Sequence, residues 1–190
     1  HLDMSGKTPT LSKAVPQVYI DLSSIAKGFG VDQVADVLEQ NHVQNYMVEI
    51  GGEIRAKGKN AENKAWQIAI EKPNNTGERA VQEVIGLNNM AMATSGDYRI
   101  YFEENSQRFA HEIDPKTGYP IQHHLASITV LAPSSMTADG LSTGLFVLGE
   151  DKALEVAEKE NIPVYLIMKT EQGFETKMSS AFQKLLANKE

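Results

Sequence analysis

Asp139 and Thr143 stand four residues apart in "TADGLSTGLFVLG", residues 137 to 149, at the start of an apolar segment. In a helix, this spacing places both side chains on one face. A buried carboxylate is costly unless it is paired or binds a cation, and carboxylate and hydroxyl oxygens suit a hard cation such as Mg²⁺. We therefore expect a metal site here. Alternatively, Thr137 or Asp139 simply caps the helix.

A second candidate site is "IDLSSIAKGFGVD", residues 20 to 32. We expect a strand that ends at Asp21, a polar turn, and then a helix. The free amides of a helix start, with Lys27 one turn in, are suited to binding phosphate. Alternatively, Asp21 and Ser23 are turn and cap residues and Lys27 faces solvent. The segment matches neither a GxGxxG nor a Walker loop, so those motifs add no support.

Two further segments combine small and hydroxylated residues. In "EIGGEI", residues 49 to 54, the paired glycines form either an ordinary hairpin turn or a bare backbone wall for a flat ring. In "ATSGDYRIYF", residues 93 to 102, Thr94 and Ser95 could donate to phosphate or ring oxygens. The alternative is a simple Ser-Gly-Asp turn, and no GxSxG elbow is present.

His111 and Asp114 lie in "HEIDPKTGYP", residues 111 to 120, where an expected strand breaks at a loop rich in Pro and Gly. A histidine just before a rigid loop is a candidate general base. The alternative is a structural histidine, the commoner role of a lone one. His123 and His124 are adjacent and would point apart in a strand, and no two histidines have zinc-ligand spacing.

The composition narrows the functional classes. The chain has 190 residues, which favours one domain, and a formal net charge of −7. An acidic protein is a poor non-specific nucleic-acid binder and needs local help to hold a phosphate-bearing ligand. The chain contains no cysteine, which excludes disulfides, thiolate zinc sites and thiol catalysis.

The predicted helices and strands that position these residues do not alternate strictly along the chain. This order favours an α+β fold over a doubly wound sheet. Helical periodicity predicts helices over Ile25–Gln40, Met136–Leu148, Asp151–Glu160 and Ala181–Ala187. The expected apolar side of the helix Ile25–Gln40 includes Val31, Val34 and Ala35. Strands are expected over Val18–Asp21, Asn45–Ile50, Glu53–Lys57, Trp66–Glu71, Val81–Leu87, Met90–Ala93, Tyr98–Glu103, Arg108–Ile113, Leu125–Leu131, Val164–Met168 and Phe174–Met178.

The ordered set of motifs resembles the ApbE family, the FAD:protein FMN transferases formerly known as thiamine biosynthesis lipoproteins. The resemblance runs from Gln17 to Met168 through "DLSSIAKGFGVD", "VEIGGEIRAKG", "WQIAIEKP", "ATSGDYR", "HEIDPKTGYP", "SITVLAP" and "TADGLSTGLFVLG". It implies a T-fold-like α+β architecture, with antiparallel or mixed sheets and packed helices. It also implies Mg²⁺-dependent transfer of FMN from FAD to a Thr or Ser hydroxyl of a target flavoprotein, with release of AMP.

The resemblance also implies roles for individual residues. Asp139 and Thr143 match side-chain metal ligands, and Ala26 matches a main-chain carbonyl ligand. His111 matches the proton acceptor, and Asp114 a helper beside it. The residues expected to line the nucleotide cleft are Ser24, Lys27, Gly51, Gly52, Glu53, Thr94, Ser95 and Asp97.

The family implies partners and a location as well. Its acceptors include flavin-bearing subunits of Na⁺-translocating NADH:quinone oxidoreductase and of the Rnf complex. Its members are usually exported and often lipid-anchored on the periplasmic face of the inner membrane. We expect residues 1–190 to form a single catalytic domain without the family's N-terminal portion. Two alternatives remain open: an FAD pyrophosphatase that forms FMN and AMP, and a flavin-binding fragment without turnover.

Overall fold

The four predicted helices are present in the computed structural model, which describes residues 1–73, 80–96, 101–104, 107–110 and 112–187. Each begins one or two residues before its predicted start. The helices are α1 (Ser23–Gln40), α2 (Ser135–Leu148), α3 (Glu150–Lys159) and α4 (Ser180–Ala187). Apolar periodicity therefore located every helix of the described chain.

Six strands form one antiparallel sheet in the order β12-β11-β10-β7-β4-β3. The central strand β10 is buried along its whole length, because elements cover both of its faces. The sheet consists of β3 (Tyr46–Ile50), β4 (Glu53–Lys57), β7 (Met90–Gly96), β10 (Leu125–Ala132), β11 (Val164–Thr170) and β12 (Gly173–Met178).

Among the described residues, three antiparallel strand pairs lie outside this sheet. β5 (Trp66–Lys72) pairs with β6 (Ala80–Leu87), and β8 (Tyr101–Glu104) pairs with β9 (Gln107–Ala110). A short N-terminal pair, β1 (Leu2–Asp3) with β2 (Thr10–Leu11), was not predicted. Antiparallel sheets with segregated helices confirm the predicted α+β class.

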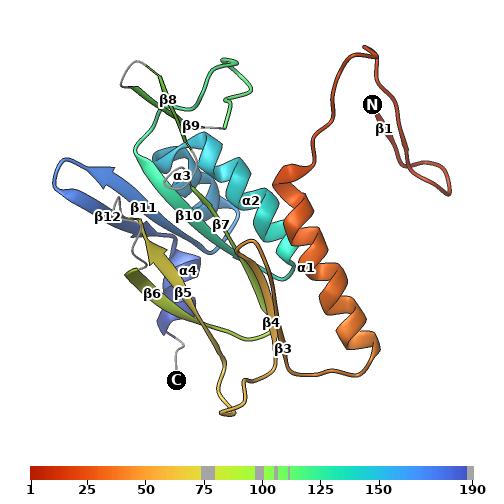
Figure 1. The fold of residues 1–190 in the computed structure, drawn as a ribbon, viewed down its shortest axis with the longest axis vertical. Helices are drawn as coiled ribbons and strands as arrows, with labels where there is room; N and C mark the ends of the chain where they lie inside the picture. The colour runs from red at the N-terminus through yellow and green to blue at the C-terminus, as the bar shows by residue number, and fades with distance from the viewer. Residues whose placement is uncertain (74–79, 97–100, 105–106, 111, 188–190) are drawn as a thin grey trace.

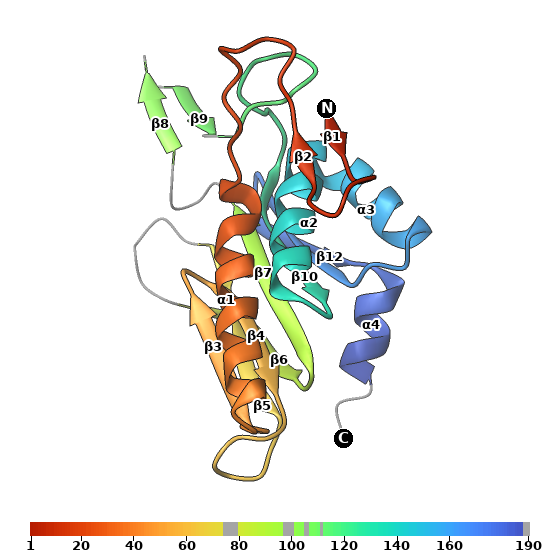
Figure 2. The same cartoon turned by 90° about the vertical axis from the view of Figure 1, so that its right-hand side faces the viewer.

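The sheet divides the core into two parts (Figures 1 and 2). On one face, α2 and α3 pack against β10 and β11, with Phe146 and Leu166 among the buried residues. On the other face, β5, β6 and α4 cover β4, β7, β10 and β11, with Leu87 and Phe182 fully buried. The sheet thus holds α1 and α2 on one face and β5 on the opposite face.

Helices α1 and α2 cross in close contact at Gly28. A β-carbon at this position would lie 2.3 Å from the Ser135 carbonyl oxygen, which is shorter than any ordinary contact. Only glycine therefore allows the two backbones to approach this closely. The close approach brings the start of α2, and with it Asp139, against the second turn of α1.

The strand predicted over Val18–Asp21 is wrong. These residues form an irregular segment, in which Val18 and Ile20 are exposed and Tyr19 is 84% exposed. The apolar alternation is real, but no described strand lies beside the segment to supply a ladder of hydrogen bonds. The Lys13 ammonium donates to the Val18 carbonyl of the segment and to the Pro16 carbonyl just before it.

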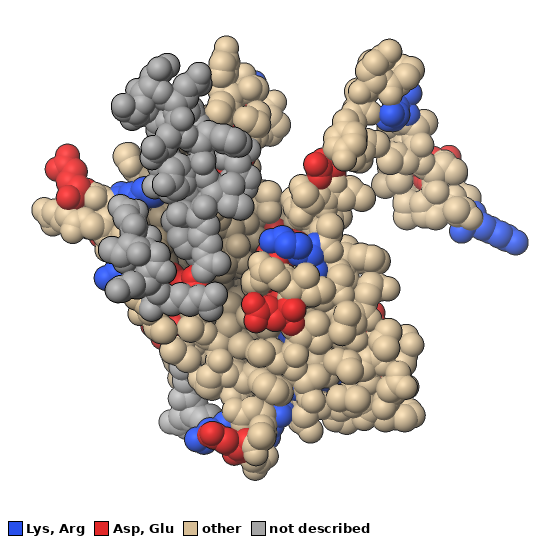
Figure 3. All heavy atoms as spheres, in the orientation of Figure 1, with Lys and Arg blue, Asp and Glu red and all other residues tan. Residues whose placement is uncertain are grey.

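The apolar side predicted for α1 is only partly buried. Val31 and Ala35 pack in a core cluster with Tyr46 and Val48 of β3, whereas Val34 is 45% exposed. Phe29 and Val37 are exposed as well, and the surface of this region in Figure 3 carries few charged side chains. No helix in the described part of the chain has the length and hydropathy that crossing a bilayer requires.

We predict that Gly28→Ala destabilises the protein by about 1–3 kcal/mol, because the added methyl forces α1 and α2 apart. The control is Gly144→Ala, on an exposed turn of α2 with nothing within 4 Å of the added carbon. This change should stabilise the helix by up to about 1 kcal/mol. Thermal unfolding measures both. Equal Tm values for Gly28→Ala and the wild type would contradict the close crossing.

Candidate functional site

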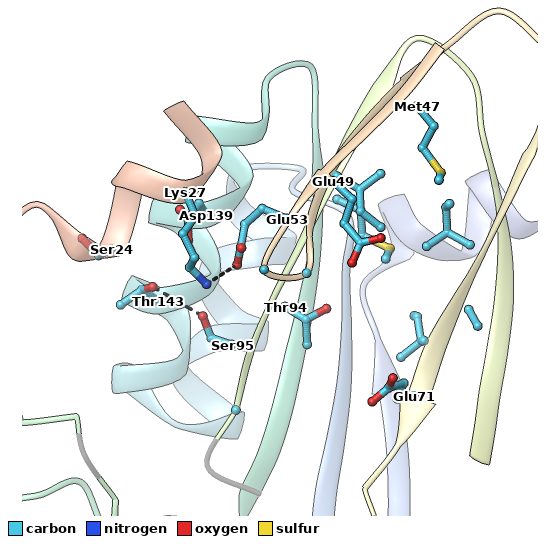
Figure 4. A pocket seen from close by; sticks show the side chains of 18 of the residues that line it. Ser24, Lys27, Met47, Glu49, Glu53, Glu71, Thr94, Ser95, Asp139 and Thr143 are labelled. Atoms are coloured by element: carbon cyan, nitrogen blue, oxygen red, sulfur yellow. Dashed lines mark hydrogen bonds and ion pairs between the residues drawn. The ribbon is translucent and has the colours of Figure 1, made fainter. Parts of the chain in front are cut away.

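A cleft of about 1020 Å³ lies between the helices and β5. Its walls come from α1, α2, the turn between β3 and β4, strand β5 and the end of β7 (Figure 4). Nine predicted site residues line it: Ser24, Lys27, Gly51, Gly52, Glu53, Thr94, Ser95, Asp139 and Thr143. The fold therefore brings together segments that are more than 100 residues apart in the sequence.

Asp139 is buried at the start of α2, with only 3% of its surface exposed. Its Oδ2 accepts a 2.9 Å hydrogen bond from the Gly28 amide of α1. Its Oδ1 accepts no hydrogen bond from the described residues. Burial raises the pKa of Asp139, and the Gly28 amide and the Lys27 charge oppose this shift.

Ser134, and not Thr137 or Asp139, supplies the side-chain cap of α2, so the capping alternative is wrong.

Thr143 belongs to a cluster of hydroxyl groups on α2 and β7. The Ser95 hydroxyl lies 2.9 Å from the Ser142 hydroxyl and 3.4 Å from the Thr143 hydroxyl. Ser142 also donates to the Asp139 carbonyl at 2.9 Å. Thr94 points from β7 to Thr129 of β10, with 2.8 Å between the hydroxyl oxygens. Strand β7 thus presents Thr94 and Ser95 from a regular ladder and not from a turn.

Glu53 is the second buried carboxylate of the cleft, with 2% of its surface exposed. Its Oε1 accepts a 2.7 Å hydrogen bond from the half-exposed Lys27 ammonium, as Figure 4 shows. Its Oε2 is buried without a hydrogen-bond partner among the described residues. Burial raises the pKa of Glu53, and the Lys27 ammonium only partly offsets this effect. The ion pair holds Lys27 over the cleft.

Gly51 and Gly52 form the two-residue turn between β3 and β4, with φ angles of 61° and 102°. Both angles lie in the left-handed region that favours glycine. The hairpin-turn alternative for "EIGGEI" is confirmed, and both residues also line the cleft; the backbone wall for a flat ring stays a prediction. The turn leaves a stretch of bare backbone beside Glu53.

The described cleft lining is strongly acidic. Its carboxylates are Glu49, Glu53, Glu71, Glu112 and Asp139, and its basic side chain is Lys27. Carboxylates at such a surface disfavour a phosphate-bearing ligand unless positive charge is added beside it. Glu49, Glu71 and Glu112 lie within "EIGGEI", "WQIAIEKP" and "HEIDPKTGYP" but were not predicted as site residues, because these segments meet only in the folded cleft.

The donors around Asp139 fit a hard divalent cation. The Asp139 Oδ1 and the Thr143 hydroxyl are oxygen ligands of the kind that Mg²⁺ prefers. Ala26, the expected main-chain ligand, lies in α1 two residues before the Gly28 amide that contacts Asp139. The described residues contain no group of three or more His, Cys, Asp or Glu that could hold a metal.

Asp114 lies outside this cleft, in the loop that ends at Pro120. Its Oδ1 accepts a 2.8 Å hydrogen bond from the Lys116 amide, and its backbone pairs with Gly118 and Tyr119. The carboxylate thus shapes the loop and lines a separate hollow beside Val147 of α2. The expected base His111 and the expected cleft residue Asp97 lie outside the described residues.

The family model described as "ApbE family" matches residues 1–166 of the chain. The chain belongs to the ApbE family. Among its curated relatives, FAD:protein FMN transferase of Haemophilus influenzae is 80% identical over 189 residues, which are 100% of this chain and 55% of that protein. The Vibrio cholerae protein of the same name is 54% identical and is matched by 98% of this chain over 55% of its own length.

Solved structures agree with this membership. "Flavin Transferase ApbE from Vibrio cholerae" has a TM-score of 0.85 and 50% identity over 97% of this ApbE-family chain and 57% of that one. The apo Pseudomonas stutzeri flavinyl transferase ApbE has a TM-score of 0.84 and 43% identity over 97% and 56%. The ApbE-type α+β fold is confirmed. The chain spans about half the length of the curated relatives it matches.

We predict that Glu53→Gln changes the pH dependence of stability in metal-free protein. Because burial raises the pKa of Glu53, the folded wild type takes up a proton at a pH at which the unfolded chain remains ionised. The wild type should therefore gain stability relative to the variant as pH falls through the raised pKa, and lose it as pH rises.

The measurement is the difference in Tm, wild type minus Glu53→Gln, between about pH 8 and about pH 5. The difference should become more positive toward the acidic end. A difference that stays constant, or that changes in the opposite direction, would contradict the burial of an ionised carboxylate at this position.

Proposed function

We propose that this chain is the catalytic part of an FAD:protein FMN transferase, the activity that its curated relatives are named for. The observation that carries the proposal is the Asp139 carboxylate. It is buried at the wall of a cleft, four residues before Thr143 on α2. One of its oxygens accepts a hydrogen bond from the Gly28 amide, and the other accepts none from the described residues. An acidic cleft needs such a cation site to bind a substrate with two phosphates.

In this proposal Asp139 Oδ1, the Thr143 hydroxyl and the Ala26 carbonyl hold Mg²⁺. When bound, Mg²⁺ neutralises the pyrophosphate of FAD and stabilises charge on the AMP that leaves. Lys27 adds fixed positive potential from the Glu53 ion pair, which keeps its ammonium at the cleft. Ser24 of α1 and Thr94 and Ser95 of β7 supply hydroxyl donors to the cleft.

The cleft also suits the two flat ends of FAD. Its volume of about 1020 Å³ lies at the upper end for ligand sites, as a dinucleotide requires. Gly51 and Gly52 leave the backbone bare for a ring to lie against it. Met47, Ile68 and Ile70 contribute apolar surface from the two strands that flank the opening. Their acidic neighbours Glu49 and Glu71 can accept hydrogen bonds from ring or ribityl donors.

The transfer step exchanges one phosphorus–oxygen bond for another. The hydroxyl oxygen of an acceptor Thr or Ser attacks the phosphorus on the FMN side, the bond to AMP breaks, and AMP leaves. His111 accepts the hydroxyl proton, and Asp114 holds the loop that follows His111. Positioning and charge stabilisation supply most of the acceleration in reactions of this class.

The acceptor and the location rest on family resemblance. The proposed acceptors are flavin-bearing subunits of Na⁺-translocating NADH:quinone oxidoreductase or of the Rnf complex. The proposed location is the periplasmic face of the inner membrane, reached through export and a lipid anchor.

One assay separates the proposed transferase from its two alternatives. The protein is incubated with FAD and Mg²⁺, with and without a Thr-bearing acceptor, and the products are followed by in-gel flavin fluorescence and chromatography. A fluorescent acceptor together with AMP supports the transferase. Free FMN and AMP, formed equally without acceptor, would indicate a pyrophosphatase. FAD that stays bound and intact would indicate a flavin-binding module.

We predict that Asp139→Ala lowers Mg²⁺-dependent FMN transfer by at least about 10²-fold, because the charged ligand at the pyrophosphate is lost. The control is Asp151→Ala, which removes a carboxylate with a 95% exposed side chain at the start of α3. This variant should transfer FMN at the wild-type rate. An Asp139→Ala protein that transfers FMN normally would refute the metal assignment.

For His111→Ala we predict transfer slower by about 10²–10⁴-fold, with FAD still bound. The rate at saturating FAD and the affinity for FAD are measured separately, the latter by fluorescence titration. If affinity falls while the rate at saturation stays normal, His111 binds the nucleotide and is not the proton acceptor.

A further inference from the structure

Asp32 of α1 binds the first free amides of α2. Its Oδ1 accepts a 3.0 Å hydrogen bond from the Ser135 amide, and its Oδ2 a 2.9 Å bond from the Met136 amide. The third free amide, on Thr137, is satisfied by the Ser134 hydroxyl at 3.2 Å. The residue is 8% exposed and does not line the cleft. A carboxylate on one helix therefore caps the N-terminus of another, where it also faces the positive end of the dipole.

This cap forms one of two contacts that join the same pair of helices. The other contact is the hydrogen bond from the Gly28 amide to Asp139 Oδ2. Gly28 and Asp32 are four residues apart on α1, and Ser135 and Asp139 are four residues apart on α2, so each pair shares a helix face. The two contacts fix both the rotation of α2 and its position along α1.

Removal of Asp32 should leave the attachment of α1 to the sheet intact. Arg55 of β4 binds Asp32 at 3.1 Å, but it also binds Asp36 and Glu39 of α1, both at 3.2 Å. Glu39 receives a further ion pair from Lys57 at 2.8 Å. Asp32 is thus the member of this ion-pair group that also contacts α2.

We infer that Asp32 is a positioning residue for the metal site. It sets the start of α2 so that the Asp139 carboxylate and the Thr143 hydroxyl face the cleft beside Ala26 and Lys27. The inference rests on the proposed function, because that function assigns the metal to Asp139. Without the Asp32 carboxylate, the Ser135 and Met136 amides lose their acceptors, and α2 is free to shift along α1. Residues that orient a metal ligand typically change metal affinity by about 10–100-fold.

The test compares Asp32→Asn with Asp36→Asn. Both variants lose one negative charge from α1 and one ion pair with Arg55, but Asp36 has no hydrogen bond to α2 among the described residues. The Mg²⁺ concentration that gives half of the maximal increase in Tm is measured in the presence of FAD. Amide hydrogen exchange of Ser135 and Met136 is measured on the same proteins.

For Asp32→Asn we expect the half-saturating Mg²⁺ concentration to rise about tenfold or more. Because the Asn side chain keeps only one acceptor oxygen, the amide that then faces its NH₂ group should exchange roughly tenfold faster. The rate of FMN transfer at saturating Mg²⁺ should fall much less than the Mg²⁺ affinity does. Asp36→Asn should match the wild type in both measurements. A lower Tm with unchanged half-saturation and unchanged exchange would make Asp32 a merely stabilising residue and overturn the inference.

A second variant tests the same contact if Asp32→Asn fails to fold. Ser135→Pro removes one donor to Asp32 and keeps the ion pair with Arg55. Proline is favoured at the first position of a helix, and Ser134 already has the extended backbone that precedes proline, with φ −125° and ψ 149°. The Ser135 hydroxyl is buried without a hydrogen-bond partner among the described residues, so no side-chain bond is lost.

Ser135→Pro should raise the half-saturating Mg²⁺ concentration in the same direction as Asp32→Asn, and an unchanged value would contradict the inference. A wild-type protein whose Tm does not respond to Mg²⁺ would instead contradict the proposed function. That result is read from the wild type alone, so the two failures are distinguishable.

Discussion

The hydrogen bond from the Gly28 amide to the buried Asp139 carboxylate is the contact on which the rest of the site depends. It requires that α1 and α2 approach so closely that a side chain at position 28 would overlap the Ser135 carbonyl. It gives one carboxylate oxygen a hydrogen-bond donor. The other oxygen, at the cleft, has no donor among the described residues. An uncompensated buried charge is unfavourable, and a cation at the free oxygen would compensate it.

The distribution of charge follows from this constraint. The cleft lining carries five carboxylates and one lysine among its described residues, yet the proposed substrate is an anion. A Lys or Arg side chain at the proposed cation position would carry a permanent charge and would form an ion pair with Asp139. In the structure, Lys27 is paired with Glu53 and not with Asp139. Glu53 therefore contributes to the site by controlling where Lys27 points.

Local patterns in the sequence predicted most of the fold. Periodic apolar residues predicted the helices, and alternating or continuous apolar segments predicted the strands from β3 onward. The exception, Val18–Asp21, shows the limit of alternation, because a strand also needs a neighbouring strand with free backbone groups. Val34 shows the same limit for helices. An apolar residue at a suitable position is buried only if another element covers it.

Site residues could be predicted where a single segment of the sequence contains a recognisable pattern. The spacing of Asp139 and Thr143, the glycine pair and the hydroxyls of "ATSG" all led to residues that line the cleft. Asp32 could not be found in this way. In the sequence it is an acidic residue on an amphipathic helix, and its partners lie more than 100 residues away. Alternation along their strands predicts which face of the strand Glu49 and Glu71 occupy. It does not predict that this face lines a cleft.

The most direct test of the metal site is a crystal structure of the protein with FAD and Mn²⁺, in which anomalous scattering locates the cation. We expect one peak in contact with the Asp139 carboxylate and the Thr143 hydroxyl, at about 2.1 Å from the oxygens as for Mg²⁺, and next to the pyrophosphate. A peak held by other carboxylates of the cleft, with Asp139 bound only to Gly28, would contradict the assignment.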